Sequence, residues 1–178
     1  MNIQGKLVTL RAIEIGDLPF LHQWSNDPEI WEGLGGWHFP YSSLTTESWI
    51  VNISKSTDSF VFAIEDDSKD LIGTISLTNI DWKNRKAFYG IMIGNKSKRG
   101  QGLAQDSVEA LLKYAFYELG LMRIESDIVE FNLRSIKFHK SMGWKFEGVK
   151  EKSYFSNGKF HNQMQIAFLS DFLVQKVD

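Results

Sequence analysis

The sequence predicts one α/β domain over residues 1–178, of the α+β kind, in which a mixed, mostly antiparallel and twisted sheet is flanked by about four helices. Three observations lead to this fold class. Several segments with apolar alternation precede the first long helical segment, as in sheets built from hairpins. The pair Asn157-Gly158 signals one more tight hairpin near the C-terminus. A length of 178 residues suits a single core, and no internal repeat divides it.

The chain is expected to begin with a strand followed by a helix. Residues 6–11 alternate between polar and apolar side chains, which indicates a strand. Residues 17–26 indicate a helix, with Asp17 as its N-cap and a proline in the first turn. The sequence Asn-Asp-Pro at 26–28 marks the end of this helix, because proline cannot continue it.

An irregular segment and a second helix are predicted next. Residues 29–41 show no clean period and contain three glycines and a proline, so we expect a loop. A helix should follow from Thr45 or Thr46, either of which can cap it, to Ile53. Trp49 and Ile53 are predicted to share its buried face.

The middle of the chain predicts three consecutive strands. Residues 60–65 and 71–79 alternate on either side of an acidic turn at 66–70, which is typical of a hairpin. A turn at 82–86 leads to an apolar strand at 88–93. Antiparallel pairing is therefore expected to dominate this part of the sheet.

The last part of the sequence predicts a strand with one helix before it and one helix after it. Residues 103–119 form a long helix that ends at Gly120, then 122–129 form a strand and 132–142 a short helix that ends at Gly143. The buried stripe of the long helix is expected to consist of Val108, Leu111, Leu112, Ala115 and Leu119.

Composition excludes several classes of function. The net charge of −2 and the pI near 6.1 argue against nucleic acid as a partner, because nucleic-acid-binding domains carry a strongly basic face. The absence of cysteine excludes disulfides, thiolate metal sites and a cysteine nucleophile. No apolar run approaches 18 residues and the start lacks an apolar signal segment, so we expect a cytoplasmic protein with no membrane partner.

Residues 87–104 carry the main functional signal. An apolar strand runs into a loop that contains Lys98, Arg99, Gly100 and Gly102, and a helix opens directly afterwards. Glycines allow close backbone approach, and a helix N-terminus attracts anions, so this junction predicts a phosphate site. The alternative is a plain β–α turn. A Walker loop is excluded, and so is the dinucleotide fingerprint, because Asp106 stands where its third glycine would be.

Two motifs resemble those of the GCN5-related N-acetyltransferases (GNAT). The pattern Arg99-x-x-Gly102-x-Ala104 matches their Gln/Arg-x-x-Gly-x-Gly/Ala pyrophosphate loop. Asn132 and Ser135, followed by Gly143-Trp144, are similar to the segment that lines the acetyl-CoA side in these enzymes. The opening LVTLRAIEIGDLPFL and the ending YFSNGKFHN look most like the ribosomal-protein N-terminal and spermidine N-acetyltransferases.

The resemblance implies a GNAT fold, acetyl-CoA (coenzyme A) as the cofactor, and a sheet splayed at the cofactor site. The pantetheine arm would pair with the strand before the loop, and the pyrophosphate would meet backbone N–H groups of the loop. The implied cofactor-binding residues are Ile91, Met92, Ile93, Lys98, Arg99, Gly100, Gln101, Gly102, Leu103, Ala104, Asn132 and Ser135. No metal is implied, and the four histidines show no ligand spacing with carboxylates.

The acid–base residues of the family cannot be carried over directly. Many relatives have a carboxylate at the position of Phe88 and a tyrosine at the position of His139. His139 is a candidate general acid or base because the pKa of a free histidine is about 6.5. The alternative is a histidine of the core or surface, with catalysis by positioning alone. Tyr154 is the second catalytic candidate.

The loop at 29–41 is where the resemblance places acceptor recognition. It is rich in rings and poor in carboxylates, which favours a primary amine on a peptide or protein N-terminus or an amino sugar. The alternatives are a polyamine or aminoglycoside acceptor, rings that only pack on the core, or a non-catalytic acyl-CoA sensor or scaffold. A homo-oligomer is left open. The candidate acceptor-binding residues are Trp31, Glu32, Trp37, His38, Phe39 and Tyr41.

Overall fold

The computed structural model describes residues 1–35 and 39–170, which form one eight-stranded sheet with the strand order β1-β2-β3-β4-β5-β6-β8-β7. Neighbouring strands are antiparallel except β5 and β6, which are parallel. The strands are β1 (Ile3–Gln4), β2 (Val8–Ala12), β3 (Phe60–Asp66), β4 (Leu71–Asp81), β5 (Lys86–Ile93), β6 (Arg123–Val129), β7 (Lys145–Ser156) and β8 (Lys159–Leu169).

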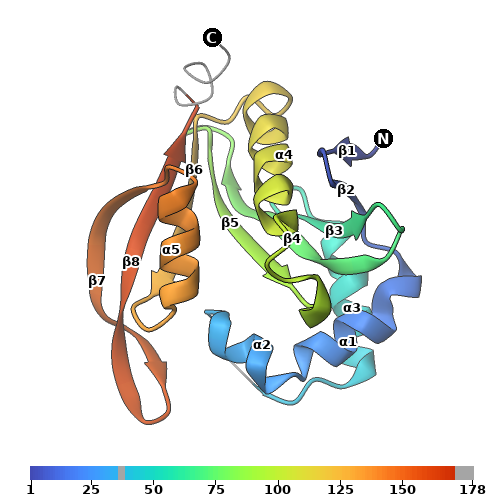
Figure 1. The fold of residues 1–178 in the computed structure, drawn as a ribbon, viewed down its shortest axis with the longest axis horizontal. Coiled ribbons are helices and arrows are strands. Elements are labelled where there is room, and N and C mark those ends of the chain that lie inside the picture. The colour runs from blue at the N-terminus through green and yellow to red at the C-terminus, as the bar shows by residue number, and fades with distance from the viewer. Residues whose placement is uncertain (36–38, 171–178) are drawn as a thin grey trace.

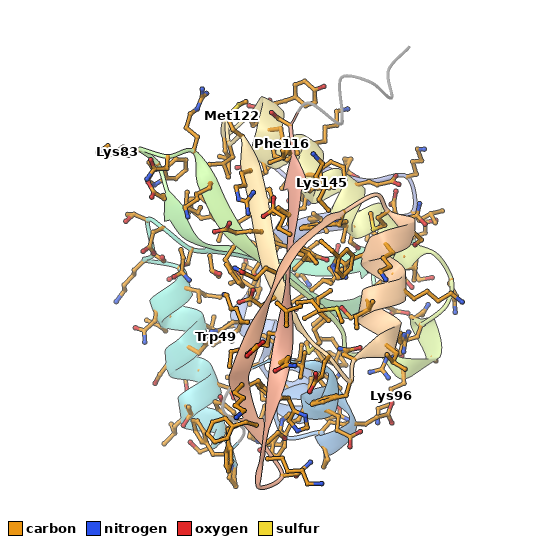
Figure 2. The ribbon with its side chains drawn as sticks, turned by 90° about the vertical axis from the view of Figure 1, so that its left-hand side faces the viewer. Trp49, Lys83, Lys96, Phe116, Met122 and Lys145 are labelled. Carbon is orange, nitrogen blue, oxygen red and sulfur yellow. The ribbon has the colours of Figure 1, made fainter. Side chains whose placement is uncertain are left out.

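Five helices cover the two faces of this sheet (Figure 1). Side chains of α4 and α5 belong to the main apolar core, whereas those of α1, α2 and α3 belong to a second cluster on the other face. Figure 2 shows this division from the side, with α3, which carries Trp49, on the left of the sheet and α5 on the right. The helices are α1 (Leu18–Ser25), α2 (Pro28–Gly33), α3 (Ser43–Ile53), α4 (Leu103–Tyr117) and α5 (Leu133–Ser141).

The predicted apolar stripe of α4 is confirmed for four of its five residues, whereas Leu119 lies beyond the end of the helix at Tyr117 and is only partly buried. Val108, Leu111, Leu112 and Ala115 are at most 2% exposed and pack against the sheet. The chain leaves the helix through Gly120, whose φ of 64° lies in the left-handed region that glycine adopts without strain. No helix in the described ranges is long and apolar enough to cross a bilayer.

The sheet opens between β5 and β6, as the predicted splay requires. These strands pair only from Lys86 to Phe88 on β5, opposite Arg123 to Glu125 on β6. Beyond this point β5 continues to Ile93 on β4 alone, while β6 continues to Val129 on β8 alone. Each strand therefore has an edge without a strand partner, and these two edges face the opening.

The prediction of a loop from residue 29 was wrong at its start, where the chain forms α2 and so brings the number of α-helices in the described ranges to five. Asp27 caps α2 by accepting a hydrogen bond from the Glu29 N–H, and Pro28 occupies the first helical position. The same Asn-Asp-Pro sequence that ends α1 therefore starts α2, because proline is compatible with the first turn of a helix.

Two predicted caps and one buried face also need correction. The cap of α3 is Ser42, not Thr45 or Thr46, since the Ser42 hydroxyl accepts from the Thr45 N–H. The buried face of α3 consists of Thr46 and Ile50, whereas the Trp49 side chain is 39% exposed.

Asp17 precedes α1 as predicted but does not cap it with its side chain. Its carboxylate instead accepts two hydrogen bonds from the Arg11 guanidinium, at 2.7 and 2.9 Å, and one from the Glu14 N–H. The Asp17 carboxylate therefore binds the charged Arg11 guanidinium, which is a stronger donor than a backbone N–H group of the helix end.

Asp106 ties the start of α4 to the N-terminal strands. It is 7% exposed, and its carboxylate accepts hydrogen bonds from the backbone N–H groups of Lys6, Leu7 and Val8 at 3.0, 2.7 and 3.0 Å. A Cβ on Gly5 would lie 2.3 Å from the carboxylate, so glycine is needed for this approach. The contact places the glycine-containing loop before α4 relative to the sheet.

We predict that Asp106→Ala lowers the free energy of unfolding by about 3 kcal/mol, because three backbone donors lose a charged acceptor. Urea denaturation followed by circular dichroism measures the change. Gln105→Ala, at the neighbouring exposed position, is the matched control and should alter stability by less than about 0.5 kcal/mol. Equal effects of the two substitutions would contradict the anchoring role.

Candidate active site

A cavity of about 1420 Å³ lies at the opening of the sheet and is called the central cavity below. Its wall combines the end of β5, the start of α4, the helices α2 and α5, and the β7–β8 hairpin. Figure 1 shows these elements around the diverging halves of the sheet, with α2 below β5 and α5. Segments from five parts of the chain therefore meet at one site.

The loop at residues 98–104, called the phosphate loop below, presents unused backbone donors. The N–H groups of residues 100–105 donate to no acceptor within the described part of the chain. Gly100 and Gly102 have φ values of 79° and 80°, which keep this turn in a conformation that other residues adopt only with strain. Adjacent free N–H groups at a helix N-terminus form an anion-binding cradle.

Both cations of the phosphate loop are paired with carboxylates. Lys98 points toward the β3–β4 turn, where its ammonium contacts Asp66 at 2.5 Å. The hydrogen bond from Lys98 lowers the pKa of Asp66, so this pair stays charged at neutral pH. Arg99 faces the central cavity, donates to the Ile93 carbonyl at 3.1 Å and contacts Glu29 at 2.6 Å. Of these two predicted cofactor ligands, Arg99 is thus the better placed.

Some of the other predicted cofactor residues line the central cavity, and others do not. Ile91, Met92 and Ile93 line the central cavity on the open edge of β5, and Ala104, Asn132 and Ser135 line it from α4 and α5. Leu103 is buried in the core, so only its backbone is available. The Gln101 side chain donates to the Ser97 carbonyl and stabilises the loop itself.

Asn132, Ser135 and His139 share one face of α5, as their spacing predicts. Asn132 caps the helix by accepting from the Ser135 N–H at 3.0 Å. Its amide also donates to the Gly33 carbonyl at 2.9 Å and so connects α5 to α2 across the cavity. A single side chain therefore sets the spacing of two walls.

His139 is more deeply enclosed than a proton-transfer group needs to be. It is 4% exposed, and its Nδ1 lies 2.8 Å from the Ser135 carbonyl. Its Nε2 has no hydrogen-bond partner within residues 1–35 and 39–170, and the rings of Tyr89 and Trp144 pack beside it with centroids 5.7 and 5.2 Å away. Burial lowers the pKa of His139, so the ring is neutral at pH 7. This placement favours the core-histidine alternative.

Tyr154, the second catalytic candidate, lines the central cavity as His139 does, and it is 9% exposed. It lies on β7 and packs against Phe131 at a ring distance of 6.2 Å. Its hydroxyl has no hydrogen-bond partner among the described residues. It can therefore donate a proton or a hydrogen bond to a bound molecule.

The predicted acceptor residues are only partly brought together. Trp31 and Glu32 line the central cavity from α2, and the Trp31 indole donates to the Ser25 carbonyl. Phe39 and Tyr41 stack with ring centroids 4.4 Å apart, and Tyr41 lines a separate cavity of about 210 Å³. Met92 contributes to both cavities. The predicted residues Trp37 and His38 lie outside the described residues.

Several lining residues were absent from the sequence prediction of the site. Glu29 comes from α2, Phe131 and Phe138 from the region of α5, and Lys159 from the β7–β8 hairpin. The signal for Glu29 was available, because Asp-Pro at 27–28 is a helix-start pattern that places the next side chains. The others depend on tertiary packing.

The geometry agrees with comparison against known proteins. A family model described as "Acetyltransferase (GNAT) domain" matches residues 8–145. The chain belongs to this family. GNAT acetyltransferases are enzymes that use acetyl-CoA, so the protein is an acetyl-CoA-dependent N-acetyltransferase and not only a binding scaffold.

Individual relatives extend over most of the chain. It is 28% identical over 158 residues to the SPbeta prophage-derived uncharacterized N-acetyltransferase YokL of Bacillus subtilis (strain 168), which covers 89% of this chain and 87% of the relative. It is 30% identical over 172 residues to the spermidine N(1)-acetyltransferase of Vibrio cholerae, covering 95% of each. The crystal structure of the Vibrio cholerae spermidine N-acetyltransferase with CoA and spermine has a TM-score of 0.86 at 27% identity, covering 93% of this chain and 96% of that one.

The residues of this GNAT enzyme fit two parts of coenzyme A, the pyrophosphate and the pantetheine arm. The free N–H groups of residues 100–105 suit a pyrophosphate, and the open edge of β5 suits the amide groups of a pantetheine arm. Arg99 lines the same cavity and adds a positive charge. Backbone groups thus supply most of the expected contacts.

We predict that Gly102→Val abolishes cofactor binding, because valine strains the φ of 80° that orients the N–H groups. For the wild type, CoA at about 100 times its Kd should raise the Tm by about 5–10 °C. Gly143→Val introduces the same strain at the end of α5, where φ is 86°, and should keep the CoA shift. An unchanged shift in Gly102→Val would place the pyrophosphate elsewhere.

His139 makes a second prediction, on the pH dependence of stability. The pKa of His139 is lowered in the folded state and is about 6.5 in the unfolded state. The contribution of the neutral ring to the free energy of unfolding is therefore complete above pH 6.5 and is lost as the pH falls. The stability of wild type relative to His139→Phe should decline below pH 6.5, by up to about 1.4 kcal/mol per pH unit. Urea denaturation from pH 8.5 to 5 tests this. Parallel curves for the two proteins would contradict it.

Proposed function

We propose that the acceptor is an α-amino group of a peptide or protein N-terminus, or the amine of an amino sugar. The observation that carries this is that, among the described residues, no free carboxylate base lies where β5 and β6 separate. Phe88 occupies the β5 position there, and its partner on β6 is Glu125. Burial would raise the pKa of Glu125, but Arg123 and Lys86 hold it below its ordinary value, so Glu125 is a weak base.

The acidity of the acceptor matters because only a neutral amine attacks. An α-amino group has a pKa of about 7.7–8.0 and is partly neutral at pH 7, whereas an alkyl ammonium at about 10.4 needs a dedicated base. His139 is enclosed and cannot serve easily as that base. The site therefore suits an amine that loses its proton to water.

The chain's own contribution to the reaction is mainly orientation. Bound acetyl-CoA supplies an activated acetyl group, which the amine takes directly while coenzyme A leaves as the thiol. N–H groups on the open edge of β5 can donate to the acetyl oxygen as negative charge develops there. The Tyr154 hydroxyl, without a partner among described residues, can give a proton to the leaving sulfur.

A polyamine is the second candidate, because two carboxylates, Glu29 and Glu32, line the central cavity. A spermidine acetyltransferase is also among the relatives that cover most of the chain. The experiment compares initial rates with acetyl-CoA for a tripeptide with a free N-terminus, a nucleotide-linked amino sugar, spermidine and an aminoglycoside. An N-blocked tripeptide is the control. We expect the peptide or amino sugar to give the highest kcat/KM, and spermidine in that place would overturn the proposal.

Tyr154→Phe should lower kcat by about 10²-fold with little change in the Kd for CoA, because only the hydroxyl is removed. His139→Phe should retain most of the activity, since His139 is assigned a packing role. Steady-state kinetics with detection of free thiol, together with CoA titration, separate these outcomes. The reverse order of effects would return the proton-donor role to His139.

A further inference from the structure

Glu29 forms ion pairs with two cations, Arg99 of the phosphate loop and Lys96 just before it. Its two oxygens contact different partners, with Oε1 2.6 Å from Arg99 Nη1 and Oε2 2.8 Å from Lys96 Nζ. Lys96 also contacts Asp27, the cap of α2, at 2.9 Å. The start of α2 is thus joined by charge to the loop that precedes α4.

Bound phosphate groups would compete for one of these contacts. Arg99 lines the central cavity next to the free N–H groups of residues 100–105, where the pyrophosphate of coenzyme A is expected. The Glu29 side chain is 57% exposed, and exposed ion pairs are weak. A multiply charged anion on the N–H cradle can therefore take Arg99 from Glu29.

Release of Glu29 does not require movement of α2. The helix stays attached through the Gly33 carbonyl, which accepts from Asn132, and through the Trp31 indole, which donates to Ser25. The Glu29 side chain has to rotate and give up its contact with Lys96, which keeps Asp27 as its ion-pair partner. Since Glu29 lines the central cavity together with Glu32, its freed carboxylate faces the space through which an amine must enter.

We propose that Glu29 is an exchangeable counter-ion that links cofactor binding to acceptor binding. Without cofactor it is held by Arg99 and Lys96, and when the phosphates of coenzyme A engage Arg99 it becomes the binding group for the ammonium of the incoming acceptor. The inference rests on the proposed function in that the acceptor arrives as a cation. Because binding linkage is reciprocal, the amine should also strengthen cofactor binding.

The decisive variant is Glu29→Gln, because its two expected effects have opposite signs. By calorimetric titration it should bind CoA about fivefold more tightly than wild type, since Arg99 is no longer occupied. At saturating acetyl-CoA its KM for the preferred amine should rise by about fivefold or more. A residue with a merely structural role would weaken both.

Two controls make the test specific. Glu32→Gln changes the neighbouring carboxylate on α2, which makes no ion pair within the described ranges, and should keep the CoA affinity of wild type. S-acetylpantetheine lacks the phosphates. When it replaces acetyl-CoA as the acetyl donor, the KM for S-acetylpantetheine should be the same with wild type and Glu29→Gln.

The outcomes are distinguishable from those for the proposed function. The CoA titration needs no acceptor, so it tests the exchange at Arg99 even if the favoured amine class is wrong. Unchanged or weaker CoA binding by Glu29→Gln would overturn the exchange, as would an equal gain with S-acetylpantetheine. Tighter CoA binding with an unchanged amine KM would overturn the link to the acceptor.

Discussion

The separation of β5 from β6 after three paired positions is the constraint on which the rest of the structure depends. Because β6 continues on β8 and β5 continues on β4, neither strand can close the gap. The opening gives the end of β5 a backbone edge without a strand partner, and α5, α2 and the β7–β8 hairpin wall it. Cofactor binding by a strand-like arm is a direct consequence of this interrupted pairing.

Charge around the opening is balanced before any ligand binds. Lys98 is paired with Asp66, and Arg99 and Lys96 share Glu29. The ion pairs stabilise the loop, while the backbone donors of residues 100–105, which have no acceptor among the described residues, can still attract phosphate. The site can therefore be stable when empty and still bind an anion, because the groups that bind and the groups that are paired are largely different.

Much of the fold was predictable where a local preference decides the structure. Asn157-Gly158 forms the expected turn with φ values of 50° and 74°, and Asn132 caps α5 as its position suggests. Errors arose where one sequence serves two elements, as at Asp27-Pro28, which follows one helix and starts another. At Asp17 a tertiary partner, Arg11, took the carboxylate from a predicted cap.

By itself, the sequence determined the strand–loop–helix junction around Gly102, the Asn132 cap of α5 and most of the apolar stripe of α4, because these depend on backbone conformation and side chains a few residues apart. Only the tertiary structure decided that the His139 ring packs against Tyr89 and Trp144 and that Tyr154 lines the same cavity as His139. It also decided the contact of Glu29 with Arg99, 70 residues along the chain. Such contacts arise from the packing of whole elements, which no local pattern encodes.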